Sequence, residues 1–388
     1  MQTTVQRGGA MISITIANHK GGSTKTTTGL HLAVGLARRG YRVLFLDNDA
    51  QGSATRWFGA EQPTLPDGEW PLCIVDVMLS PLLARTEDQV QWEELIQETN
   101  IEHLSLIPST EKMQEVDPKI MEILQRALQQ DPTVVTRLKN QRLDATDLDT
   151  MLLKRLPDLP AKWDFCIIDT PPGMNLVTRN SLVATDWIII PIDMAPLTLD
   201  GTGAMMNYMR ELEKRNGKKL HTLGVLATVV EGNTVLSQKL LNDLHSFFVE
   251  NLFGTKIRKT VKMKEASGFQ QPAYDYAPEE MATYEYDRFC DEVLARLKAR
   301  GVAVPDPPYP AKEPIPLPRS NQPKPAPKKG KPRRKSMIST KSTGGGSAGR
   351  ANMPAQPVGA SEGNPHIPEG ASHEQVAAAS EQETRKTV

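Results

Sequence analysis

The chain of 388 residues lacks any apolar run long enough to cross a bilayer, which takes about 18 to 20 residues. Its longest apolar candidate, residues 187–199, is interrupted by two prolines and an aspartate. A signal-peptide pattern is also absent, because the apolar residues 11–17 lead directly into a histidine and a lysine without a cleavage region. These absences predict a cytoplasmic protein rather than a membrane or secreted one.

Cysteine is scarce, and the three that occur are Cys73, Cys166 and Cys290. They lie too far apart in the sequence for a zinc knuckle or a C-x-x-C redox pair. Paired ligand cysteines for an iron–sulfur cluster are likewise missing. We therefore expect three buried thiols in a reducing compartment.

Net charge is absent from the chain as a whole, with 46 Lys and Arg against 46 Asp and Glu. The balance conceals two unlike parts, because residues 301–388 carry a net charge of +6 and residues 1–300 one of −6. The C-terminal part also holds 15 of the 30 prolines and a single aromatic residue, Tyr309. Such a segment cannot bury enough apolar surface to offset the entropy of ordering. We predict a disordered leader at 1–10, a folded domain at 11–300 and a disordered, proline-rich basic tail at 301–388.

Short apolar runs rich in Val, Ile and Leu alternate with helical patterns in the folded part. Helical stripes are expected at 30–37, ended by Gly40, and at 120–128, opened by Pro118. This alternation predicts an α/β protein with a doubly wound, mostly parallel sheet flanked by helices. The segment 111–162 is long for one crossover and is predicted to hold two or three further helices. The expected strands are 12–17, 43–46, 104–107, 165–168, 187–192 and 223–230.

A glycine-rich loop, K-G-G-S-T-K-T-T at residues 20–27, follows the first predicted strand and opens a helix. In this position the backbone N–H groups and the helix N-terminus favour a polyphosphate. Lys25 is expected to reach the β- and γ-phosphates, and the Thr26 hydroxyl to bind Mg²⁺. Thr24 stands where such loops usually have glycine. The expected nucleotide contacts of the loop are Lys20, Gly21, Gly22, Ser23, Thr24, Lys25, Thr26 and Thr27.

Two acidic motifs end other predicted strands. Residues 47–55 read D-N-D-A-Q-G-S-A-T, and residues 165–173 read F-C-I-I-D-T-P-P-G. A carboxylate that leaves a buried strand beside a phosphate loop is placed to hold Mg²⁺ through water. Asp169 is therefore predicted to belong to a metal site.

The loop at 20–27 resembles the deviant P-loop of the ParA/MinD family of dimeric ATPases, and residues 47–55 are similar to the family's D-x-D-P-Q-G-x-A-T, with Ala50 in place of proline. The resemblance implies a P-loop NTPase that uses ATP and Mg²⁺. It also implies that Lys20 reaches the partner's phosphates in an ATP-sandwich homodimer. By the same likeness Asp49 polarises the attacking water, and Asp47 supports the water shell of the metal.

The likeness extends over residues 11–300. Residues 263–278 are similar to the family's E-A-x-S-x-x-x-P stretch near the adenine, which assigns Met263 and Glu265 to the nucleotide site. The basic segment 256–264 lies where relatives carry DNA-contacting residues, and a solvated loop is the alternative. Nonspecific DNA affinity comes almost entirely from neutralised phosphates. The candidate DNA contacts are Lys256, Arg258, Lys259, Lys262 and Lys264.

The sequence of the C-terminal tail helps to decide which branch of the family the chain resembles. A MinD-like member would end in a membrane-binding amphipathic helix, and a tyrosine kinase of this lineage would need a C-terminal tyrosine cluster; neither pattern occurs after Arg300. The remaining ParA branch implies a weak ATPase that binds DNA nonspecifically on the nucleoid, is stimulated by a ParB-like or other adaptor, and partitions a plasmid or chromosome. The alternatives are an ATP-gated DNA- or partner-binding regulator with incidental hydrolysis, and the positioning of a protein assembly.

Within the tail, residues 312–350 contain 11 Lys and Arg against one glutamate. A disordered cationic arm of this kind can hold DNA electrostatically. A solubilising linker and a docking segment for a protein partner are the alternatives.

Three other side chains are predicted to have structural roles. His31 is expected on the surface of the helix that follows the phosphate loop. Trp57 and Phe58 are expected to pack under the loop that carries Asp49.

Overall fold

The computed structural model describes residues 11–60, 73–79, 91–110, 113, 147–194, 198–232 and 235–318. The helical stripe predicted at 120–128, most of the 111–162 segment and the basic residues beyond 318 lie outside the described residues.

The described residues form an eight-stranded sheet with the order β3-β4-β2-β5-β1-β6-β7-β8. Only the short β3 runs antiparallel to its neighbour, and the other strand pairs of the described sheet are parallel. The predicted doubly wound, mostly parallel sheet is thereby confirmed. The strands are β1 Ile12–Ile16, β2 Val43–Asp47, β3 Gln97–Glu98, β4 Leu104–Ile107, β5 Phe165–Asp169, β6 Trp187–Asp193, β7 Thr222–Val230 and β8 Leu252–Arg258.

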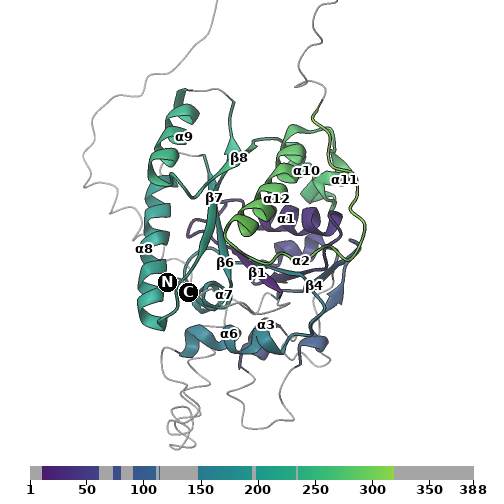
Figure 1. The fold of residues 1–388 in the computed structure, drawn as a ribbon, viewed down its shortest axis with the longest axis vertical. Helices are drawn as coiled ribbons and strands as arrows, with labels where there is room; N and C mark the ends of the chain where they lie inside the picture. Colours follow the sequence, from purple (N-terminus) through teal and green to yellow (C-terminus); the bar gives the residue numbers. More distant parts are fainter. Residues whose placement is uncertain are drawn as a thin grey trace, which may run out of the picture. The chain divides into compact units, whose positions relative to one another are not determined.

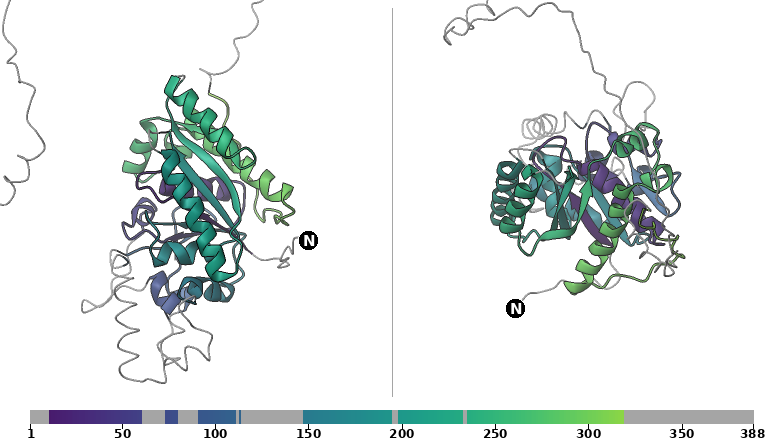
Figure 2. Two further views of the ribbon diagram at one scale, coloured as in Figure 1. Left: turned by 90° about the vertical axis from the view of Figure 1, so that its left-hand side faces the viewer. Right: turned by 90° about the horizontal axis from the view of Figure 1, so that it is seen from above.

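Helices cover both faces of the sheet (Figures 1 and 2). Successive side chains of a strand point to opposite faces of the sheet. In β2, Val43 and Phe45 accordingly belong to the apolar cluster on one face, and Leu44 and Leu46 to the cluster on the other. One face is covered by α1 Lys25–Arg38, α2 Ser53–Trp57, α10 Lys262–Gly268, α11 Ala273–Tyr276 and α12 Met281–Ala299. The other carries α3 Ile74–Leu79, α6 Met151–Arg155, α7 Leu176–Ala184, α8 Thr198–Asn216 and α9 Val235–Phe247.

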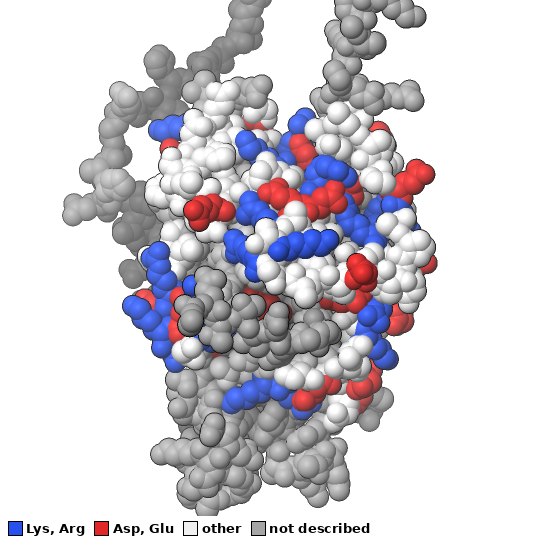
Figure 3. Space-filling view, in the orientation of Figure 1, with Lys and Arg blue, Asp and Glu red and all other residues white. Residues whose placement is uncertain are grey.

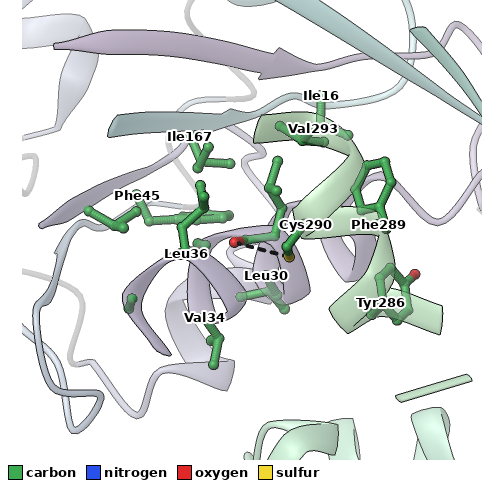
Figure 4. Close-up of a cluster of buried hydrophobic side chains, with 14 of the residues drawn as sticks. Ile16, Leu30, Val34, Leu36, Phe45, Ile167, Tyr286, Phe289, Cys290 and Val293 are labelled. Atoms are coloured by element: carbon green, nitrogen blue, oxygen red, sulfur yellow. Dashed lines mark hydrogen bonds between the residues drawn. The ribbon is translucent and has the colours of Figure 1, made fainter. Parts of the chain in front are cut away.

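Helix α1, which begins at the phosphate loop, packs against the sheet and against α12 (Figure 4). The two helices approach closely at Gly35, where an added Cβ would lie 2.3 Å from the Sγ of Cys290. The helix ends as predicted, with Gly40 at φ +84° just beyond it. Close packing from both sides fixes the axis of the helix whose N-terminus faces the candidate site.

His31 is not on the helix surface, and the prediction that placed it there was wrong. Its side chain is buried because α12 covers this face of α1, and its ring stacks on Tyr286 with the centroids 4.5 Å apart. Nδ1 lies 2.7 Å from the carbonyl oxygen of Thr27, so the ring carries its hydrogen on that nitrogen. Burial lowers the pKa of His31 to about 4.

The composition predicted that the folded domain ends near residue 300. In the structure the chain stays in contact with the body beyond that residue. Residues 302–318, called the C-terminal strap below, run in extended form along the body and appear yellow-green in Figure 1. Tyr309 stacks on His103 with centroids 3.7 Å apart, its N–H donates to the carbonyl of Gly40, and Ile315 is buried in the cluster of α1 and α12. Backbone hydrogen bonds and a few side chains hold the strap because the folded body already provides the surface, and prolines keep the segment extended at low entropic cost.

All three cysteines are free and buried, as expected. Trp57 and Phe58 are also buried, in the cluster that contains α2. Within the described residues, no helix has both the length and the apolar character needed to cross a bilayer.

Candidate functional site

The candidate site lies where the carboxyl ends of β1, β2 and β5 meet. Asp169 at the end of β5 is in register with Ile16 of β1 on one side and Asp47 of β2 on the other. Ligands of parallel α/β sheets bind at this edge, beyond the carboxyl ends of the strands. The sheet thus brings the phosphate loop and both acidic motifs together, as the sequence predicted.

The phosphate loop is held by its own side chains. The Ser23 hydroxyl donates to the carbonyl of Lys20 at 2.9 Å, and Gly22 has φ +73°, which suits glycine. Asn18 is buried; its amide donates to the carbonyl of Pro191 at 2.7 Å, and its oxygen accepts from the N–H of Lys20 at 3.2 Å. Sequence reasoning missed Asn18, although a polar residue directly after a buried strand was a signal.

Lys25 is buried at the start of α1, and its Nζ donates to the carbonyl of Lys20 at 3.2 Å. Burial lowers its pKa, while the carboxylates of Asp169 and Asp49 raise it. The ammonium therefore stands between the loop and the two acidic motifs, where a bound phosphate would need it.

Asp169 is fully buried, and neither of its carboxylate oxygens has a hydrogen-bond partner of good geometry within the described structure. Burial raises its pKa well above the usual range and nearby Asp47 raises it further, whereas the Thr26 side chain and Lys25 act in the opposite direction. An unpartnered carboxylate is costly inside a protein. Hard oxygen ligands of this kind fit Mg²⁺, which keeps several waters and takes one or two protein ligands beside phosphate.

Asp47 organises the loop after β2. Its Oδ2 accepts from the N–H and the hydroxyl of Thr55, both at 2.7 Å, and its Oδ1 accepts from the N–H of Asp49 at 3.2 Å. Burial raises the pKa of Asp47 to about 6. With these three donors the carboxylate has a structural role; the predicted support of a metal water shell stays a prediction.

Asp49 keeps one carboxylate oxygen free within the part of the chain that the structure describes. Oδ1 accepts from the N–H of Gln51 at 3.0 Å, and the backbone carbonyl accepts from the hydroxyl of Ser109 at 2.6 Å. The loop is therefore fixed while Oδ2 stays available to a water molecule, which is compatible with the predicted role.

Lys20 lies against its own chain. Its Nζ is 3.3 Å from the Oδ2 of Asp193 at the end of β6, and its side chain is 40% exposed. Reaching a second molecule would require this exposed ion pair to open, at a cost of about 1 kcal/mol or less. The predicted contact across a dimer stays a prediction.

Met263 and Glu265 are not joined to the phosphate loop by any hydrogen bond or ion pair among the described residues. Met263 is a buried residue of α10, and Glu265 accepts from Lys262 at 2.7 Å and from the hydroxyl of Tyr276 at 3.0 Å. Their assignment to the adenine stays a prediction.

The basic segment 256–264 is the edge strand β8 followed by α10 rather than a loop. Three of its five positive side chains have acidic partners: Arg258 pairs with Glu285, Lys259 with Glu231, and Lys262 with Glu265. Lys256 and Lys264 have no such partner among the described residues. Figure 3 shows positive and negative side chains interleaved on the face that it draws. The segment is thus less positive than its sequence suggests.

Fold and loop together define the class as a P-loop nucleotide-binding protein. Residues 11–222, more than half of the chain, match a family model described as "AAA domain".

Two relatives make the placement more specific. The sporulation initiation inhibitor protein Soj of Bacillus subtilis is 28% identical over 282 residues, which cover 73% of this chain and 98% of Soj. The chromosome-partitioning ATPase Soj of Thermus thermophilus is 28% identical over 289 residues, covering 74% and 96%. The chain therefore belongs to the AAA domain family, and its similarity to the two Soj proteins supports the predicted ParA/MinD resemblance and its Soj branch.

A solved structure gives the same fold. Cobyrinic acid a,c-diamide synthase from Mycobacterium smegmatis, with bound ADP and magnesium, superposes with a TM-score of 0.57 at 23% identity, over 76% of this chain and 98% of that one. At this identity the likeness concerns the fold alone.

Proposed function

We propose that the chain is a Mg²⁺-dependent ATPase that forms an ATP-sandwich homodimer, binds DNA without sequence preference and partitions a plasmid or chromosome. A ParB-like or other adaptor stimulates its hydrolysis. The observation that carries the proposal is the placement of a buried lysine, Lys25, near a buried carboxylate, Asp169, at one phosphate loop. The name of the Thermus thermophilus relative, a chromosome-partitioning ATPase, supports it.

The residues of this chain have separate tasks in that reaction. Backbone N–H groups of the loop and the N-terminus of α1 bind the phosphates, and Lys25 neutralises charge that moves onto the leaving group. Asp49 orients the attacking water with its free oxygen. Bound Mg²⁺ neutralises phosphate charge, and Thr26 and Asp169 are the residues that would hold it, Asp169 through water.

The proposal is tested by titrating ATP calorimetrically with and without Mg²⁺. Lys25→Ala should weaken ATP binding roughly 10- to 100-fold, as expected when a charge-assisted hydrogen bond is removed. Lys256→Ala is the matched control, because this lysine of β8 has no ion pair in the described structure, and it should bind ATP normally. If Lys25→Ala and Lys256→Ala bind ATP equally well, the loop does not hold phosphate and the proposal fails.

Asp169→Asn gives an independent check on the metal. The variant should lose the strengthening of ATP binding by Mg²⁺, while the nucleotide-free protein should unfold at an equal or higher temperature, because a costly buried carboxylate has been removed. A loss of nucleotide-free stability together with unchanged Mg²⁺ dependence would assign Asp169 a purely structural role.

The dimer is tested by light scattering. Lys20→Ala should still bind ATP but remain monomeric, whereas Lys256→Ala, the control at another lysine, should dimerise like the wild type. ATP-dependent dimers of Lys20→Ala would exclude the sandwich arrangement.

A further inference from the structure

Two β-branched residues have positive φ, one within the phosphate loop and one beside a residue that contacts it. Thr24, the last residue before α1, has φ +60°, and Val229, near the end of β7, has φ +54°. Such residues rarely adopt this conformation. Strained backbone persists only where the surroundings fix it, and it gathers at functional and switching positions. The register of β7 with β8 is also irregular between Ala227 and Val230.

One hydrogen bond between hydroxyls joins Thr24 to Thr228, the residue before Val229. The hydroxyl of Thr24 donates to the hydroxyl of Thr228 at 2.9 Å, and Thr228 is fully buried. Thr228 in turn donates its own hydrogen to the carbonyl of Ile192 at 3.1 Å. Thr228 therefore links the phosphate loop to the ends of both β6 and β7.

The Thr24 hydroxyl has a second acceptor, the carbonyl of Ser23 at 2.6 Å. A hydroxyl carries one hydrogen. Its bond can therefore lie within the loop, toward Ser23, or across to β7, toward Thr228. These are two discrete arrangements of one side chain at the position where a phosphate would bind.

The end of β7 is also connected to the basic segment. The carbonyl of Val230 accepts from the N–H of Lys259 at 3.0 Å, and the next residue, Glu231, pairs with the ammonium of Lys259. A movement of Thr228 would pass through the strained Val229 to both contacts of Lys259.

We propose that Thr228 is a positioning residue that couples the phosphate loop to the β7–β8 edge, so that nucleotide on the loop shifts Lys259. The coupling rests on the proposed function, because the loop must bind a nucleotide for it to operate. Its physical basis is a two-position hydroxyl beside a strained strand end. Thr24, where glycine is usual in such loops, supplies the hydroxyl that glycine lacks.

The first experiment needs no nucleotide. Hydrogen exchange of the Lys259 amide is compared in the wild type, in Thr228→Val, which removes the hydroxyl at nearly constant volume, and in Thr228→Ser, which keeps it. The Thr228 hydroxyl makes two hydrogen bonds, from Thr24 and to Ile192. Thr228→Val should therefore exchange at least roughly two- to tenfold faster, the factor expected when one hydrogen bond is removed, and Thr228→Ser should match the wild type. Equal exchange in all three proteins would overturn the coupling whether or not the protein binds ATP.

A double-mutant cycle tests the hydroxyl pair itself. In a Thr24→Gly background the partner hydroxyl is gone, so Thr228→Val should change Lys259 exchange by less than it does alone, and the remaining change would come from the bond between Thr228 and Ile192. Additive effects of the two substitutions would show that the residues act separately and would overturn the pair.

The third experiment adds ATP and Mg²⁺. ATP should slow the exchange of the Lys259 amide in the wild type and in Thr228→Ser, but not in Thr228→Val, which should still bind ATP. The same ATP-dependent protection in Thr228→Val would overturn the proposal, while a wild-type protein that binds no ATP would count against the proposed function instead.

Discussion

The imidazole of His31 lies at the centre of the packing between α1 and α12. Its Nδ1–H is bonded to Thr27, and its Nε2 is buried without a partner in the described part of the chain. Protonation would place an unpaired charge in this interior. The helix that presents the phosphate loop therefore depends on a neutral histidine.

This burial makes stability depend on pH in a defined direction. The pKa of His31 falls from its ordinary value of 6.5 to about 4 in the folded chain. Between these values the unfolded chain binds the proton and the folded chain does not, so stability is lost as pH falls from 6.5 toward 4. The total loss is about 3 kcal/mol, of which about 2 kcal/mol appears by about pH 5.

We predict that His31→Phe, which keeps an aromatic ring on Tyr286, removes this component. Urea unfolding at about pH 7 and about pH 5 should show a fall in the free energy of unfolding that is smaller than in the wild type by about 2 kcal/mol. His245→Gln, at an exposed histidine, is the control and should behave like the wild type. Equal losses in wild type and His31→Phe would show that another group governs this pH range.

At the scale of elements, the C-terminal strap crosses the end of α1 at Gly40. An added Cβ there would lie 2.0 Å from the carbonyl oxygen of Tyr309, so any larger residue lifts the strap. The neighbouring contacts are the N–H of Lys312 with the carbonyl of Arg38 and the buried side chain of Ile315. The strap therefore fastens the helix that leads from the phosphate loop.

A matched pair of glycines isolates the contribution of the strap. Gly40 has φ +84°, and Gly59 has φ +65° with nothing within 4 Å of its added Cβ. Gly59→Ala should cost about 1 kcal/mol for backbone conformation alone, and Gly40→Ala about 2 kcal/mol more, since burial of one Ile side chain is worth that amount. Thermal unfolding measures both, and equal costs would mean that the strap contributes nothing.

Truncation provides the complementary test. Ending the chain after residue 318 should leave the unfolding temperature unchanged, and ending it after residue 300 should lower it. In the shorter chain Gly40→Ala should cost no more than Gly59→Ala, because the obstructing carbonyl is gone.

Most strands were predictable because Val, Ile and Leu are continuous wherever both faces of the sheet are covered. The edge strand β8 was missed because it carries Lys256 and Arg258, which a sheet edge tolerates. Asn18 and Thr228 were missed as contacts of the phosphate loop. They lie at the ends of β1 and β7, and which strand ends lie near the loop depends on the order of strands in the sheet. His31 was misplaced because a helix periodicity does not reveal a second covering helix.

At the scale of the whole molecule, positive charges available to DNA occur in two places, the basic segment 256–264 and the sequence after the strap. Ion pairs reduce the basic segment to Lys256 and Lys264, whereas residues 319–350 of the sequence carry ten Lys and Arg and no acidic residue. We therefore expect the sequence after the strap to supply most of the phosphate contacts.

Removal of residues 319–388 tests this expectation while leaving the strap in place. The slope of log affinity for random-sequence DNA against log salt should become shallower by about 0.9 for each DNA phosphate that the shortened protein no longer neutralises. Lys256→Ala with Lys264→Ala in the full chain, the comparison for the body, should change the slope by about 2 or less. An unchanged slope after truncation would place the DNA contacts on the body.

The two edges of the sheet have a consequence for how copies of the chain can associate. An unpaired edge strand invites another chain to add a strand, and proteins block this with very short strands or with charge. Here β3 has two residues, and β8 carries Lys256 and Arg258. Growth of the sheet from molecule to molecule, with the aggregation that follows, is disfavoured at both ends. Association between copies is thereby directed to other faces, among them the one that holds the phosphate loop.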